Sequence, residues 1–259
     1  MFIDRKGLYI CETLFPLVTK GAVLWRLASI STISNLLGII HPNSSPATNV
    51  AAKVVVLLKS SSIWSGILAE LAKLLDPEQT VLLEDNQLVE YAYQLVLLGY
   101  KLGKLLPGGV DMLYSSGYLT VLCHTSCMGE VITMKNAFLT SNNEDLQKAV
   151  LQLFNGIVQS ITMLVTDYPL VKDNARLVAR FLRKNNGLVI YLLRLQDSSI
   201  TGVQVLSSVL NLLLASLSSL AVVAEKNWHH AEMGQELVGE IQELLPDCLA
   251  WLKIMGKKI

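Results

Sequence analysis

Leucine accounts for 49 of the 259 residues, and the leucines recur three or four positions apart along the whole chain. This spacing places apolar side chains on one face of an α-helix, because the helix repeats every 3.6 residues. No segment shows the alternation of apolar and polar residues that is typical of a half-buried strand. The sequence therefore predicts an all-α fold of about ten helices, each of roughly 10–20 residues.

The expected helices are separated by prolines, glycines and short polar side chains, which favour loops. Pro107, Gly108 and Gly109 are predicted to stop one helix, and Gly117 is predicted to be a joint within the next. An apolar helix is also expected close to the N-terminus. The other predicted helices cover residues 23–40, 50–58, 63–75, 84–106, 110–128, 144–165, 170–184, 188–195, 203–224 and 234–255.

The starts of these helices recur irregularly, about every 20–35 residues, which is typical of helical repeats that stack into solenoids. Residues 187–195, the turn at 196–199 and the apolar segments at 203–206 and 210–213 resemble an armadillo repeat junction. Residues 143–155 are similar to the start of another repeat. The resemblance implies a right-handed armadillo-like or HEAT-like α-solenoid, and the choice between the two repeat types stays open. We interpret residues 1–259 as a single α-helical repeat domain, a fragment or short isoform of a longer solenoid.

The last hundred residues also resemble, in their general pattern of apolar helices, the C-terminal part of the vertebrate meiosis inhibitor protein family. This resemblance implies a nuclear scaffold for the machinery that makes DNA double-strand breaks in meiotic recombination. Without it, the expected location is the cytoplasm.

Charge is scarce in this chain. Only 16% of the residues are charged and the formal net charge is zero, whereas globular chains carry about 25% charged residues. Much apolar surface must therefore be buried inside the protein, against a partner or in lipid. Direct binding of nucleic acid is not expected, because such binding depends on clustered positive charge.

No residues are predicted to be catalytic, to bind a cofactor or to bind a metal ion, so an enzyme is not expected. The four cysteines have no disulfide spacing, and we interpret them as reduced thiols of an intracellular protein. Cys123, His124 and Cys127 form the one thiol and imidazole cluster, which we interpret as part of a core helix because zinc needs further ligands. His229 and His230 are interpreted as a solvated helix start.

A membrane-spanning segment is the main alternative. Residues 198–224 contain no charged side chain, and about 20 apolar residues can cross a bilayer. The segment nevertheless contains seven serines, and Gly202 suggests a boundary between two helices. Two buried solenoid helices explain the same pattern, so membrane association is not expected, although a multi-helix membrane protein with a span near 198–224 stays an alternative.

The candidate binding surface is electrostatic. Lys172, Arg176, Arg180 and Lys184 follow one another at four-residue steps, with Arg183 beside them. On one helix these residues form a basic stripe that could bind an acidic partner helix or tail. The alternative interpretation is an ordinary solvated face, perhaps opposite Glu232, Glu236, Glu240 and Glu243. The sequence thus predicts a non-enzymatic scaffold that binds other proteins through a helical groove or the basic stripe.

Overall fold

In the computed structural model, the described residues are 2–39, 50–60, 62–76, 86–124, 144–168 and 172–185, together with a few between 188 and 215. Within them all regular structure is helical and no strand occurs. The prediction of an all-α fold is therefore confirmed for this part of the chain. The chain divides into two compact units, one formed by Met1–Leu75 and Gln79–Val121, the other by Asp76–Glu78 and Leu122–Ile259.

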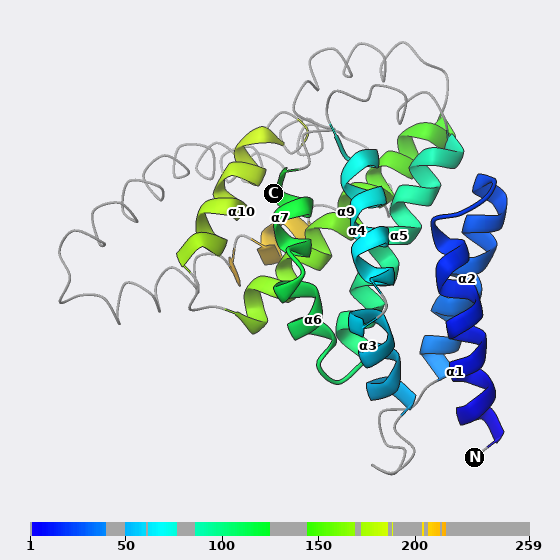
Figure 1. Cartoon of the computed structure of the whole chain (residues 1–259). Helices are drawn as coiled ribbons and strands as arrows, with labels where there is room; N and C mark the ends of the chain where they lie inside the picture. Colours follow the sequence, from blue (N-terminus) through cyan, green and yellow to red (C-terminus); the bar gives the residue numbers. More distant parts are fainter. Residues whose placement is uncertain are drawn as a thin grey trace, which may run out of the picture. The chain divides into compact units, whose positions relative to one another are not determined.

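The first unit contains most of the described helices, which Figure 1 shows in blue to green. Within it α1 packs against α2 and α3, and α5 packs against α2, α4 and α6. The elements are α1 (Phe2–Leu14), a 3-10 turn η1 (Phe15–Val18), α2 (Val23–Ile39), α3 (Val50–Ser60), α4 (Ile63–Leu74), α5 (Asn86–Leu105), α6 (Gly109–Ser115) and the start of α7 (Tyr118–His124).

Helix α5 contacts three other helices of this unit, α2, α4 and α6. Its buried residues occupy one broad face, as expected for an amphipathic helix that packs against a core. The buried residues of α5 are Val89, Tyr91, Ala92, Leu95, Val96, Leu98, Gly99 and Leu102.

The predicted boundaries agree with the described helices in most places, and one prediction was wrong. Gly117 is a joint, since it separates α6 from α7 with a φ angle of +81°. Gly109, however, does not stop a helix but begins α6. Gly108 makes the turn with a φ angle of +72°, a backbone conformation that glycine adopts without steric cost. A side chain on Gly109 would also collide with the backbone carbonyl of Leu102.

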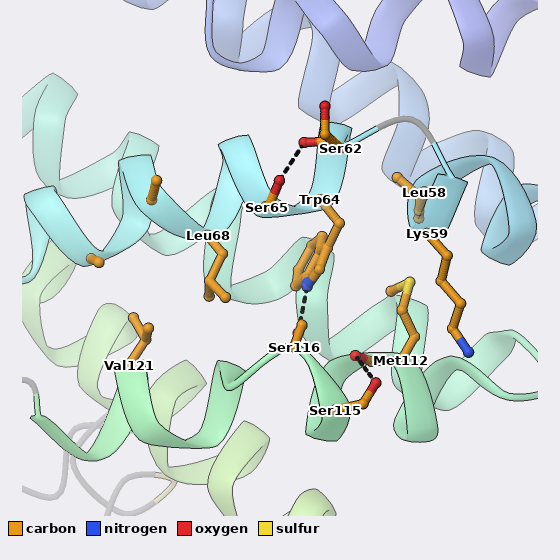
Figure 2. Close-up of a pocket in the computed structure, with 12 residues that line it drawn as sticks. Leu58, Lys59, Ser62, Trp64, Ser65, Leu68, Met112, Ser115, Ser116 and Val121 are labelled. Atoms are coloured by element: carbon orange, nitrogen blue, oxygen red, sulfur yellow. Dashed lines mark hydrogen bonds between the residues drawn. The ribbon is translucent and has the colours of Figure 1, made fainter.

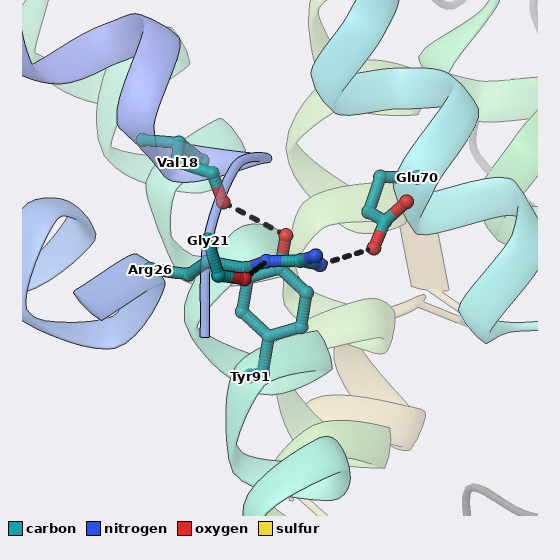
Figure 3. Close-up of polar contacts among 5 residues, drawn as sticks. All are labelled: Val18, Gly21, Arg26, Glu70 and Tyr91. Atoms are coloured by element: carbon teal, nitrogen blue, oxygen red, sulfur yellow. Dashed lines mark hydrogen bonds and ion pairs between the residues drawn. The ribbon is translucent and has the colours of Figure 1, made fainter. Parts of the chain in front are cut away.

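A polar cluster joins α2 to α4 and α5, as Figure 3 shows. The guanidinium of Arg26 donates one hydrogen bond to the Gly21 carbonyl at 2.8 Å and another to Glu70 Oε1 at 2.6 Å. It also lies 5.5 Å from the centre of the Tyr91 ring. The Tyr91 hydroxyl in turn donates to the Val18 carbonyl at 2.8 Å. This cluster satisfies the polar groups where η1 and α2 meet the core.

In the second unit, the long helix α9 (Glu144–Asp167) packs against α10 (Lys172–Lys184). Phe154 and Phe181 stack with their ring centres 5.9 Å apart, and Val178 and Leu182 extend the buried face of α10. Asn185 ends α10 by donating a side-chain hydrogen bond to the Phe181 carbonyl at 2.8 Å. The predicted helix at 170–184 is thus confirmed from Lys172 onward, and residues 170 and 171 lie outside the described residues.

Helix α9 contains a segment, residues 148–167, that is long and apolar enough to cross a membrane. It is the one such helix among the described residues, or one of two if the bent pair α3 and α4 counts as a single broken span. Core helices of water-soluble proteins have the same length and composition, and 61% of this segment is buried in the structure. Of the predicted alternative span at 198–224, only residues 204, 207–212, 214 and 215 are described.

Candidate functional site

A groove in the first unit is the clearest candidate site. It lies between α4 on one side and α6 with the start of α7 on the other, and its volume is about 590 Å³. Ligand sites commonly measure about 300–1,000 Å³. The groove is lined by Leu58, Lys59, Ser62, Trp64, Ser65, Leu68, Ala69, Ala72, Met112, Ser115, Ser116 and Val121.

The floor of the groove is rigid and apolar. Leu58, Trp64 and Met112 are almost fully buried, whereas α4 contributes exposed small side chains, including Ala69 and Ala72, to the wall. The Trp64 indole N–H donates a hydrogen bond across the groove to Ser116 Oγ at 2.8 Å (Figure 2). This bond joins the two walls at the level of the floor and fixes the orientation of the indole ring.

A close contact beneath the floor supports Trp64. The Tyr118 ring packs edge-on against the indole, with ring centres 5.7 Å apart. Its hydroxyl donates to the Val96 carbonyl of α5 at 3.0 Å. This position is open only because residue 99 is glycine, since a Cβ atom there would lie 2.5 Å from the Tyr118 hydroxyl oxygen. Gly99 therefore positions Trp64 through Tyr118.

Three of the four serine hydroxyl groups of the groove are engaged as donors. Ser65 donates to the Ser62 carbonyl at 2.7 Å. Ser115 and Ser116 donate to the carbonyls of Met112 and Leu113, at 3.2 Å and 2.8 Å. Ser116 Oγ also accepts the hydrogen bond from the Trp64 indole. The groove is thus an apolar surface with few free donors.

Lys59 supplies the one charged side chain of the lining. It lies in the last turn of α3, at the end of the groove where α4 begins (Figure 2). Its side chain is exposed, and it makes no ion pair or hydrogen bond with any residue that the structure describes. This end of the groove therefore carries positive charge.

The predicted basic stripe falls on α10, in the second unit. Lys172, Arg176, Arg180, Arg183 and Lys184 all lie within this helix, as predicted. Arg180 and Lys184 are exposed and Arg183 is half-buried, while the side chains of Lys172 and Arg176 lie outside the described residues. Because four residues correspond to slightly more than one helical turn, the stripe winds around α10 rather than running straight along it.

The thiols that the structure describes are buried and protonated. Burial, with a smaller contribution from the charge of Glu12, raises the pKa of Cys11 from 9.0 to about 11. Burial also raises the pKa of Cys123. A buried, protonated thiol is a poor nucleophile and a poor metal ligand. Cys127, His229 and His230 lie outside the described residues. Among the residues that the structure describes, no three histidine, cysteine, aspartate or glutamate side chains lie close enough together to bind a metal ion.

Comparisons of the chain with protein-family models, with curated proteins and with solved structures find no match.

The groove was not predicted residue by residue from the sequence. Its two walls come from segments about fifty residues apart, and one sequence does not tell which helices become neighbours. The sequence nevertheless contained one indication of the groove. Trp64 is one of only four tryptophans, and the face of the helix that follows it contains Leu68 and two small residues, Ala69 and Ala72.

Proposed function

We propose that the chain is a non-enzymatic protein-interaction module, and that the groove between α4 and the α6–α7 pair receives a helix of a partner protein. The observation that carries this proposal is the open apolar groove over the fixed Trp64 indole. Helices with one apolar face commonly bind in grooves of this kind. Buried aromatic side chains at the centre of an interface contribute most of its binding free energy.

The chemistry of the lining supports binding rather than catalysis. It contains no carboxylate, imidazole or thiol, which are the groups that most often transfer protons in enzymes. Ser65, Ser115 and Ser116 of the lining donate their hydroxyl protons to backbone carbonyls.

We propose further that the helices stack as an armadillo-like or HEAT-like solenoid. The all-helical character of the described residues and the packing of α3 on α4 and of α5 on α6 support this architecture. The resemblance of residues 187–213 to an armadillo repeat junction supports it from the sequence. A solenoid would present several such helix faces to partners.

A matched pair of arginine substitutions tests the groove. Ala69→Arg places a long charged side chain in the groove, whereas Ala28→Arg makes the same change at an exposed position of α2 outside it. Proteins captured from cells by the unmodified chain should be retained by Ala28→Arg and lost with Ala69→Arg. Equal capture by both variants, with unchanged helicity, would exclude the groove as the binding site.

The basic stripe on α10 is a second candidate surface, and the exposure of Arg180 and Lys184 favours it. Basic residues in the last turn also stabilise the helix dipole, so their presence has a structural explanation as well. Reversal of Lys172, Arg176 and Arg180 to glutamate separates the two roles. Loss of partner capture at unchanged helicity is expected if the stripe binds a partner, and retained capture would remove it from consideration.

The process in which we propose that this module acts, meiotic double-strand break formation, is supported by the sequence resemblance of the last hundred residues alone. The corresponding test is the location of the tagged chain in meiotic cells. Nuclear accumulation is expected at the stage of break formation, and purely cytoplasmic or membrane staining would contradict the proposal.

A further inference from the structure

The two ends of the groove differ in charge, and this difference indicates the chemistry of its occupant. Lys59 and Ser62 mark one end, where α4 begins, and Ala72 marks the other. The eleven residues from Ser62 to Ala72 span about 15 Å of helix, or roughly three turns. Positive charge is confined to the first end, and the rest of the lining is uncharged.

The wall that α4 contributes has the spacing of a helix-packing seam. Ser65, Leu68, Ala69 and Ala72 follow one another at intervals of three, one and three residues, so they occupy one face of α4. Small side chains on such a face allow the axis of a second helix to approach closely, with its apolar side chains entering the space between them. The exposure of Ser65, Ala69 and Ala72 leaves this face open to an incoming helix.

The first end of the groove favours an anion for two reasons. The Lys59 ammonium has no partner among the described residues. The first amide groups of α4 also lack an intrahelical acceptor, and Ser62, at the N-cap position, makes no side-chain hydrogen bond to them. A carboxylate placed there would meet the positive charge of Lys59 and the positive end of the α4 dipole.

We infer that the occupant of the groove is an acidic amphipathic helix of about three turns, which presents aliphatic side chains to Leu68, Ala69 and Ala72 and an aspartate or glutamate to Lys59. This inference rests on the proposed function, since it specifies the partner helix that the groove receives. The aliphatic side chains fill the apolar length of the groove, and the carboxylate fixes the direction in which the helix lies.

Selection from a displayed library of helical peptides tests this inference. The full-length chain is the target, and Ala69→Arg is used to discard peptides that bind elsewhere. We expect the selected peptides to carry aliphatic residues at positions i, i+4 and i+7 and an acidic residue near one end. Failure to select any peptide that Ala69→Arg rejects would overturn both the proposed function and this inference.

The charge preference is then measured on a single selected peptide with two matched variants. Lys59→Glu reverses the charge at the groove, whereas Lys53→Glu makes the same change at an exposed position of α3 outside the lining. At low salt, Lys59→Glu should weaken binding by about five- to tenfold, and Lys53→Glu by less than about twofold. A version of the peptide with lysine in place of its acidic residue should bind Lys59→Glu more tightly than the unmodified chain.

These outcomes distinguish the inference from the function on which it rests. Peptides that depend on Ala69 but show no acidic preference, or that respond equally to Lys59→Glu and Lys53→Glu, would leave the groove as a binding site and overturn the acidic helix. Circular dichroism and thermal unfolding of each variant show whether it has kept its fold.

Discussion

The groove of the first unit and the basic stripe of α10 are opposite kinds of candidate binding surface. The groove is built from side chains about fifty residues apart, is almost uncharged and has a buried indole as its floor. The stripe lies on a single helix and consists of charged side chains, of which Arg180 and Lys184 are exposed. Binding to the groove should therefore depend mainly on packing, with salt screening only the contribution of Lys59, whereas binding to the stripe should weaken steeply as salt screens its charges.

The same contrast applies to stability. Substitution of a side chain that belongs both to a binding surface and to the core lowers the free energy of unfolding. Substitution of a side chain on an exposed surface has little effect on it. Loss of binding through a groove substitution thus requires a check of folding, and the most informative substitutions are those that separate the two effects.

The largest effect is expected from Trp64→Ala. Removal of the buried indole should lower the free energy of unfolding by about 3–5 kcal/mol, because it leaves a cavity and removes the hydrogen bond to Ser116. Arg180→Ala, in the stripe, should change it by less than about 0.5 kcal/mol. Urea unfolding measures both, and similar losses for the two variants would remove the distinction between a core-linked groove and an independent stripe.

A smaller loss is expected from Gly99→Ala. The added methyl group would displace the Tyr118 ring and, through it, Trp64, at a cost of about 1–3 kcal/mol. The matched control is Gly66→Ala in α4, where a Cβ atom meets nothing within 4 Å.

Because alanine favours a helix more than glycine does, Gly66→Ala should stabilise the protein by up to about 1 kcal/mol. Thermal unfolding should show a lower melting temperature for Gly99→Ala and a higher one for Gly66→Ala. If Gly66→Ala also lowered the stability, the loss in Gly99→Ala could not be attributed to the contact with Tyr118. This result would contradict the support of Trp64 by Gly99.

Arg26, in a partly buried ion pair with Glu70, can be compared with the exposed arginine of the stripe, Arg180. The side chains of Arg26 and Glu70 are 22% and 24% exposed and 2.6 Å apart. Glu70→Gln should cost about 1–2 kcal/mol, because Arg26 would lose a charged acceptor. A double-mutant cycle with Arg26→Lys measures the coupling between the two, and a coupling near zero would show that the contact contributes nothing to stability.

A pH effect is expected from the buried thiol of Cys11. The pKa of Cys11 is about 11 in the folded protein and about 9 in an unfolded chain. The folded state therefore keeps a proton that the unfolded state loses, so this contribution is complete below pH 9 and is lost as the pH rises through 11. Cys11→Ala should reduce the fall in the free energy of unfolding between pH 8 and pH 10.5, as measured with urea. An identical fall in both proteins would contradict the assignment.

The sequence predicted the elements of the first unit better than their arrangement. Apolar spacing located α2 to within one residue, and Gly117 was identified as a joint. Gly109 was misassigned because a run of proline and glycine indicates a break but does not show which residue starts the next helix. The contact between Gly99 and Tyr118 could not be predicted, since it depends on which faces of α5 and α7 meet.

The candidate sites show the same limit. The stripe was predicted because its residues share one helix, and i to i+4 spacing is enough to place them together. The groove depends on long-range packing and was foreseen only as a general expectation that helical stacks contain grooves. Its charged end, Lys59, stands out in the structure only because the rest of the lining is uncharged.

The environment of Trp64 has a spectroscopic consequence. A shielded indole that donates a hydrogen bond should fluoresce at short wavelength and resist collisional quenching by iodide. Trp25, which is 73% exposed on α2, should emit at longer wavelength and be quenched readily. With Trp228 and Trp251 changed to phenylalanine, the two remaining tryptophans would both lie in the first unit, one at the groove floor and one facing water. A ligand in the groove should alter the first emission and leave the second unchanged, so occupancy could be read without any added label.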